Sequence, residues 1–79
     1  MPKKIFIGDL NITTTESTLN TTFSPYGTIV ALTLNTNPSG GPNTADCEYT
    51  TEAAGTAAIA AKDGSRLDGA TITVTAATS

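Results

Sequence analysis

The order of six short periodic segments limits the folds that this chain can adopt. In four of them apolar and polar residues alternate, as in a strand with one buried face: Lys4–Gly8, Thr28–Asn35, Thr44–Tyr49 and Thr71–Ala76. The other two have the spacing of short amphipathic helices, the first between Thr13 and Phe23 and the second between Thr51 and Gly64. Strands and helices therefore follow one another in the order βαββαβ.

This order predicts an α+β fold, the ferredoxin-like sandwich, in which two helices cover one face of a four-stranded antiparallel sheet. The chain of 79 residues has room for a single hydrophobic core, so we expect one domain spanning residues 1–79. The alternation predicts the side chains that point from the strands into this core: Ile5, Ile7, Val30, Leu32, Leu34, Ala45, Cys47, Tyr49, Ile72 and Val74.

The two predicted helices have narrow apolar faces. In the first, Thr13 and Glu16 have the spacing of an N-terminal capping box, and Leu19 and Phe23 follow one turn apart. Threonine is frequent in this segment although it lowers helix stability by about 0.5–0.7 kcal/mol relative to alanine. In the second helix, small residues and one isoleucine are expected to face the core: Ala54, Ala58, Ile59 and Ala61.

Composition argues against several classes of function. Seven acidic residues against four basic ones give a net charge of −3, whereas nucleic-acid binders are usually basic. One cysteine and no histidine argue against an ordinary zinc or iron–sulfur site, and we expect no metal and no cofactor. No apolar run has the length of a membrane span or signal peptide, so we expect a cytoplasmic or recombinant protein without a targeting signal.

Several motifs resemble the RNA recognition motif (RRM) family. The stretch IFIGDL at Ile5–Leu10 is similar to the short RNP2 signature of that family, and FSPYG follows the first predicted helix. The pattern G-x-x-L-D-G-x-x-I at Gly64–Ile72 continues the likeness, which covers the chain from Lys4 to about Ala76. The resemblance implies a platform for single-stranded RNA on the open face of the sheet, where bases stack on aromatic side chains.

The longer RNP1 signature of the family falls on Pro42–Tyr49, and its outward positions depart from the family pattern. Phe6 carries over as the RNP2 aromatic, but Pro42 replaces the basic residue of RNP1, and Thr44 and Asp46 replace its two stacking aromatics. Stacking contributes about 1–3 kcal/mol per base, so the two replacements remove about 2–6 kcal/mol of binding free energy. The positions that would bind RNA are Lys4, Phe6, Thr44 and Asp46.

Our first hypothesis is that the sequence is artificial, designed or redesigned on an RRM-type backbone as a stable monomeric scaffold, with no selected activity and no dedicated partner. It is favoured by the outward RNP1 positions and by Thr22, which stands where the family usually has leucine. The alternative is an RRM domain with a degenerate RNP1 that binds single-stranded RNA weakly. A third hypothesis is a module that binds peptides on its helix side, although the helices lack bulky anchors.

The remaining chemistry-bearing residues have simpler interpretations. Cys47 lies at an inward strand position, so it is expected to be a small core residue rather than a redox or metal thiol. Asp46 and Glu48 share one strand face, but the sequence shows no histidine and no nucleophile beside them, so we expect no enzyme. Gly40 and Gly41 fall between two strands, a context that indicates a hairpin loop rather than a phosphate cradle.

Overall fold

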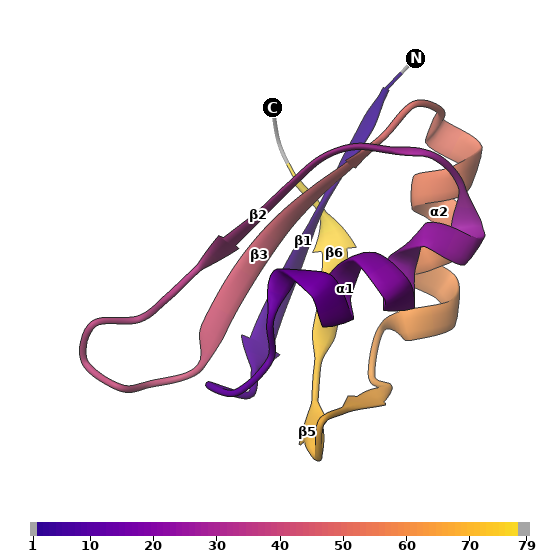
Figure 1. The fold of residues 1–79 in the computed structure, drawn as a ribbon. Helices are drawn as coiled ribbons and strands as arrows, with labels where there is room; N and C mark the ends of the chain where they lie inside the picture. The colour runs from indigo at the N-terminus through magenta and orange to yellow at the C-terminus, as the bar shows by residue number, and fades with distance from the viewer. Residues whose placement is uncertain (1, 78–79) are drawn as a thin grey trace.

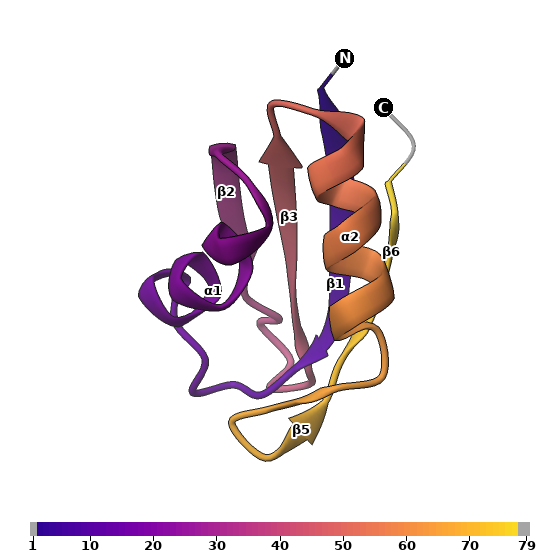
Figure 2. The same ribbon diagram turned by 90° about the vertical axis from the view of Figure 1, so that its right-hand side faces the viewer.

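A four-stranded antiparallel sheet with two helices on one face forms the body of the protein in the computed structural model, which describes residues 2–77 (Figures 1 and 2). The strand order in the sheet is β2-β3-β1-β6, as predicted for the ferredoxin-like sandwich. The elements are β1 (Lys3–Leu10), α1 (Glu16–Phe23), the 3-10 helix η1 (Ser24–Tyr26), β2 (Ile29–Asn35), β3 (Asn43–Tyr49), α2 (Glu52–Lys62), β4 (Arg66–Leu67), β5 (Ala70–Thr71) and β6 (Thr73–Ala76).

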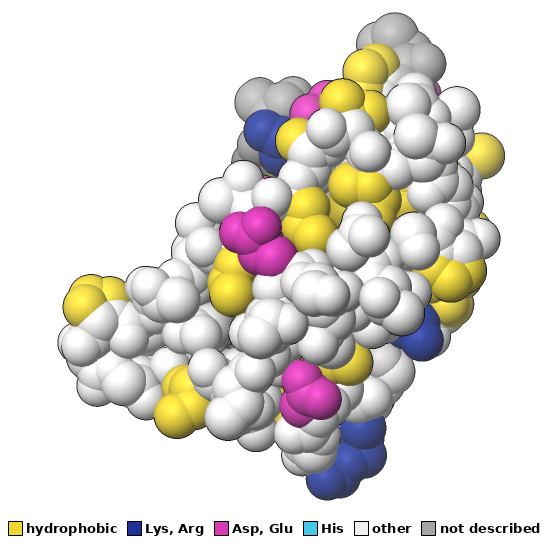
Figure 3. Space-filling model, in the orientation of Figure 1, with side chains coloured by type: hydrophobic (Ala, Val, Ile, Leu, Met, Phe, Trp, Pro, Cys, Tyr) yellow, Lys and Arg dark blue, Asp and Glu magenta, His cyan; other side chains and the backbone are white. Residues whose placement is uncertain are grey.

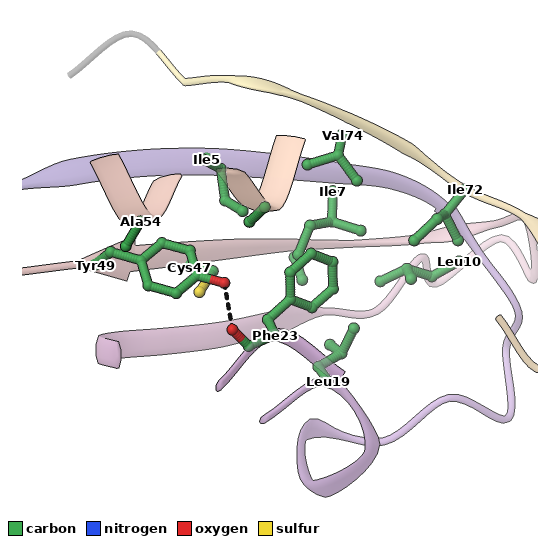
Figure 4. Close-up of a cluster of buried hydrophobic side chains, with 12 residues drawn as sticks. Ile5, Ile7, Leu10, Leu19, Phe23, Cys47, Tyr49, Ala54, Ile72 and Val74 are labelled. Atoms are coloured by element: carbon green, nitrogen blue, oxygen red, sulfur yellow. Dashed lines mark hydrogen bonds between the residues drawn. The ribbon is translucent and has the colours of Figure 1, made fainter. Parts of the chain in front are cut away.

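The hydrophobic core lies between the sheet and the helices (Figure 4). The predicted inward residues of the two central strands are fully buried, and Leu19 and Phe23 of α1 pack against them. The core is formed by Ile5, Ile7, Leu10, Leu19, Phe23, Ala45, Cys47, Tyr49, Ala54, Ala58, Ile72 and Val74. Because the inward positions of β1 and β3 are filled in this way, the alternate residues of both strands face the opposite side of the sheet.

A β-bulge at the start of β2 makes the prediction for Val30 wrong. Ile29 pairs with Tyr49 and Ala31 pairs with Glu48, so two steps along β2 match a single step along β3. The extra residue reverses the alternation, so Ile29 packs against the core while Val30 is 58% exposed. Beyond the bulge, Leu32 and Leu34 pack against the core as predicted.

A second bulge extends β1 beyond its predicted end at Gly8. Ile7 pairs with Ala45 and Leu10 pairs with Asn43, so β1 again has one residue more than β3. Asp9 lies in this bulge and has a φ of 60°, a left-handed conformation that aspartate tolerates better than most residues. The bulge turns Leu10 toward the helices, where it is buried in the core.

The N-terminus of α1 is capped by Thr15, and the predicted capping box of Thr13 and Glu16 is wrong. The Thr15 hydroxyl accepts a hydrogen bond from the Thr18 backbone N–H at 3.2 Å. Glu16 is the first helical residue, and its carboxylate accepts a 3.4 Å hydrogen bond from the Leu34 N–H of β2. The helix therefore starts later than predicted. Each of three successive threonines could serve as the N-cap, and the structure uses the third, Thr15.

Helix α2 begins after Thr51, whose hydroxyl accepts a hydrogen bond from the Ala54 N–H. Ala54 and Ala58 are buried as predicted, Ile59 is half-buried, and Ala61 is exposed. Gly55 is a buried position that the sequence did not reveal. A Cβ atom added there would overlap the Lys3 side chain, so glycine allows α2 to lie close to β1. These small residues explain how the second helix packs tightly on the sheet.

The predicted last strand is divided into two. It breaks at Ile72, whose N–H donates to the Ser65 carbonyl at 2.9 Å, and a short hairpin of β4 and β5 precedes β6. The hairpin turns at Asp68, which has a φ of 52°. The buried Thr14 hydroxyl donates to the Asp68 carboxylate at 2.7 Å, which ties the hairpin to the segment between β1 and α1.

Candidate nucleic-acid interface

The face of the sheet opposite the helices carries the candidate site (Figures 1 and 2). We call it the open face. Its side chains alternate with the core residues of the four strands, and the bulges and register place the following residues on it: Lys4, Phe6, Gly8, Ala31, Thr33, Asn35, Thr44, Asp46, Glu48, Thr73 and Thr75. All four predicted site residues belong to this set, so the strand register gathers them on one surface.

Phe6 and Asp46 form a cross-strand pair at the centre of the open face. The Phe6 side chain is 37% exposed, and Thr75 of β6 is its partner on the other side. A Cβ atom at Gly8 would lie 2.8 Å from the Thr73 hydroxyl oxygen and 3.5 Å from the Phe6 ring. Because glycine has no such atom, no side chain projects from this position beside the aromatic ring, and a planar ligand could lie on the ring.

The Asp46 carboxylate is held by a neighbour on β2. The side-chain amide of Asn35 donates a hydrogen bond to Asp46 Oδ2 at 3.1 Å. Thr33 is the register partner of Asp46 on the same strand. A carboxylate has about four lone-pair sites, so this one bond leaves acceptor capacity on Asp46 for a ligand. The position that the family fills with a stacking aromatic therefore presents a fixed acceptor.

Lys4 is the basic side chain of the open face. It is exposed on β1, and its register partner on β3 is Glu48. The two residues line a hollow of about 170 Å³ together with Ala31, Thr33 and Asp46. One cation among two carboxylates gives this end of the face little attraction for phosphate groups, in contrast to the basic surfaces of most nucleic-acid-binding domains.

Thr44 and Lys4 flank the central pair along their strands. Thr44 is two residues from Asp46 along β3, and Lys4 is two residues from Phe6 along β1. Thr44 pairs with Asn35 on β2. The structure thus brings Phe6 and Asp46 together and leaves the other two predicted residues flanking them.

Residues at the end of β6 form a part of the surface that sequence reasoning missed. A hollow of about 380 Å³ is lined by Phe6 and Asp46 together with Thr75, Ala76 and Ala77. Alternation with the inward residues Ile72 and Val74 puts Thr75 on the outward face of the last strand, but its position beside Phe6 depends on the pairing of β6 with β1. Only the antiparallel register between β6 and β1 shows that these residues lie beside Phe6, and alternation within a single strand does not reveal that register.

Two titratable side chains are buried behind the open face, the thiol of Cys47 and the phenol of Tyr49. Burial raises the pKa of the Cys47 thiol to about 11, although the neighbouring Tyr49 lowers the pKa in part. Burial also raises the pKa of Tyr49, and the neighbouring Cys47 adds to that rise. Cys47 is fully buried, which confirms it as a core residue, and its raised pKa argues against a reactive thiol.

The surface shows no large charged region in the view of Figure 3, where acidic and basic side chains appear as separate groups among uncharged ones. Within residues 2–77, no group of three or more histidine, cysteine, aspartate or glutamate side chains could hold a metal ion. No helix in the described part of the chain is long and apolar enough to cross a membrane.

Comparison with known proteins places the chain in a family. A sequence model of the RNA recognition motif matches residues 5–73. Among solved structures, the Pes4 RRM3 is similar with a TM-score of 0.90 and 26% identity, over 98% of this chain and 93% of that one. The Mip6 RRM3 domain has a TM-score of 0.90 and 22% identity, over 96% and 93% of the two chains. No curated protein sequence gives a significant match.

A third similar structure is that of the Rna15 RRM with bound RNA (GU), with a TM-score of 0.83 and 17% identity over 96% of this chain and 83% of that one. The family match extends over most of the sequence, so the chain belongs to the RNA recognition motif family, which is an RNA-binding and non-enzymatic family. None of these matches supports an artificial origin of the sequence.

Proposed function

We propose that this domain binds single-stranded RNA weakly on its open face. A base stacks on Phe6, and Lys4 contacts a neighbouring phosphate. The observation that carries the proposal is the placement of Phe6, which is 37% exposed at the centre of the sheet in a chain of the RNA recognition motif family. Every base has an aromatic face, so one exposed ring on a flat sheet is enough for sequence-tolerant stacking.

The expected affinity is low because the rest of the platform is missing. Thr44 and Asp46 occupy the outward RNP1 positions, and two absent stacking contacts remove about 2–6 kcal/mol. Asp46 and Glu48 repel phosphates beside the only basic residue found on the described open face. Non-specific binding at physiological salt has dissociation constants of about 0.1 mM to 1 μM, and this acidic domain belongs at the weak end or beyond it.

The similar structures support the same ligand class. The Rna15 RRM holds RNA in its solved structure, and the present chain has the same fold over nearly its whole length. At 17% identity the likeness concerns the fold, so the proposal rests on Phe6 and on family membership rather than on shared contact residues.

A titration of the ¹⁵N-labelled protein with short single-stranded RNA at low salt tests the proposal. We expect concentration-dependent shifts of the amide signals around Phe6 and in β3, and their loss in Phe6→Ala. The matched control is Ile12→Ala, because Ile12 is 64% exposed but lies outside the sheet, between β1 and α1. Wild-type signals that stay unmoved, or a Phe6→Ala variant that binds like the wild type, would contradict RNA binding on this face.

The second candidate is a scaffold without a ligand, the interpretation that the sequence first favoured. Its support is that Thr44 and Asp46 stand where the family has aromatics, while every inward residue of β3 fits the core. The same titration separates the two candidates, since a scaffold without a ligand gives a well-dispersed spectrum that does not respond to RNA.

A further inference from the structure

We propose that Asp46 makes the Phe6 site selective for guanine. The inference rests on the proposed RNA binding and adds the identity of the base. Phe6 and Asp46 are directly opposite each other on neighbouring strands. Side chains in such a pair have Cβ atoms about 4.5–5.5 Å apart, so the edge of a base that lies on the Phe6 ring reaches the Asp46 carboxylate.

The groups that flank the ring differ in what they can recognise. The Thr75 hydroxyl on the β6 side both donates and accepts hydrogen bonds, so it can pair with any base edge. The Asp46 carboxylate on the β3 side only accepts them. Both side chains line the hollow that contains Phe6. The edge of the base that faces Asp46 must therefore carry donors.

Guanine meets this requirement best among the four bases. Its Watson–Crick edge presents the N1–H and N2 amino donors side by side, a pair that matches the two oxygens of a carboxylate. Adenine and cytosine each place one amino group next to a ring nitrogen that accepts. Uracil has one N–H donor between two carbonyl oxygens, and a carboxylate repels these two oxygens. Single-stranded RNA exposes these edges because its bases are free of pairing partners.

Asn35 supports the selectivity by holding the carboxylate in place. Its side-chain amide donates to Asp46 Oδ2 at 3.1 Å from the adjacent strand. This contact limits rotation of the carboxylate before RNA binds, so less side-chain freedom is lost on binding. Asn35 is a positioning residue in this arrangement, since it acts on the base through Asp46.

The test compares short RNAs of sequence UUXUU, in which X is guanine, uracil, adenine, cytosine or inosine, by amide-shift titration at low salt. Wild-type protein is expected to bind the guanine RNA at least about fivefold more tightly than the uracil RNA, the lower range for a bidentate contact. Inosine lacks the N2 amino group, so its RNA should lose most of this preference without any change in the protein.

Asp46→Asn and Glu48→Gln form a matched pair of variants. Each removes one negative charge from the open face, so both should bind the uracil RNA more tightly. Asp46→Asn also removes the guanine contact, so it alone should bring the guanine-to-uracil ratio below about twofold. If wild-type protein binds all the RNAs equally, or if Asp46→Asn keeps the preference, the guanine assignment is wrong while RNA binding stands. If no RNA binds, both proposals fail.

Discussion

The hydroxyl of Tyr49 donates a hydrogen bond of 2.6 Å to the backbone carbonyl oxygen of Phe23, and both residues are fully buried (Figure 4). The bond joins the last residue of β3 to the last residue of α1, two residues that are 26 positions apart in the chain. It anchors the backbone of Phe23, where α1 ends and the 3-10 helix η1 begins, to the sheet. The contact therefore fixes how α1 sits on the sheet.

Removal of this bond should destabilise the fold. Tyr49→Phe keeps the ring but leaves the Phe23 carbonyl without its tyrosine partner, so we expect a loss of about 1–2 kcal/mol in the free energy of unfolding. Urea denaturation followed by circular dichroism measures it. Tyr26→Phe removes the same atom from a half-buried tyrosine and should change the free energy by less than about 0.5 kcal/mol. Equal effects of the two changes would contradict the structural role of the Tyr49 hydroxyl.

Stability should fall in alkali because the folded state holds two protons more tightly than the unfolded state. Burial raises the pKa of Cys47 from 9.0 to about 11, and that of Tyr49 also rises above 10.0. The unfolded chain releases these protons first, so the stabilisation is complete below about pH 9 and is lost as the pH rises toward 11. Cys47 contributes a slope of about 1.4 kcal/mol per pH unit between pH 9 and about 11, and Tyr49 adds a similar slope above pH 10.0.

Urea midpoints measured at intervals between pH 8 and 11 test this expectation. In Cys47→Ala the decline should begin near the ordinary tyrosine pKa of 10.0 instead of near 9.0. A wild-type midpoint that stays level up to pH 11, or a Cys47→Ala profile identical to it, would contradict the raised pKa of the buried thiol.

Two threonines of α1 should respond in opposite directions to alanine. Thr21 is exposed inside the helix, so Thr21→Ala should raise stability by about 0.5 kcal/mol through helix propensity. Thr15 is the N-cap, so Thr15→Ala should lower stability by about 1 kcal/mol. Chemical denaturation of both variants gives the signs directly. A loss of stability in Thr21→Ala would reveal a contact of its side chain that outweighs propensity.

Alternation within each segment was enough to predict the fold, because inward positions of short strands must be apolar wherever one face is buried. It placed Ala45, Cys47 and Tyr49 in the core and Phe6 on the open face, as the structure confirms. It failed where a strand gains a residue. A bulge leaves no mark in the composition of β2, so Val30 was assigned inward although the residue before it takes that place.

The bulge at the start of β2 can itself be tested by mutation. Ile29 packs against the core and Val30 is 58% exposed, so Ile29→Ala should cost about 1–2 kcal/mol and Val30→Ala less than about 0.5 kcal/mol. An unbroken alternation would give the reverse order. The unfolding free energies of these two variants therefore distinguish the bulged strand from the regular one.

The residues of the candidate site could also be predicted from the sequence, but their arrangement in space could not. The RNP2 and RNP1 likeness indicated Lys4, Phe6, Thr44 and Asp46 as a set. The pairing of Phe6 with Asp46 and Thr75, and the Asn35 bond to the carboxylate, depend on the strand register and on contacts between side chains that are far apart in the sequence. Because of these contacts, Asp46 is a candidate hydrogen-bond acceptor at a position where the family has an aromatic residue. The alternation within one strand does not predict such contacts.

Restoration of one stacking residue should raise RNA affinity and remove selectivity together. Asp46→Tyr places a second aromatic ring beside Phe6 and removes a negative charge, so binding of single-stranded RNA should strengthen by about 1–3 kcal/mol, or roughly 5- to 150-fold. The guanine preference should disappear, because stacking tolerates every base whereas the carboxylate does not. Titration with the guanine and uracil RNAs measures both effects. Glu48→Gln, which changes only charge, separates the stacking gain from reduced repulsion, and a Tyr variant no tighter than this control would show that the open face does not stack bases.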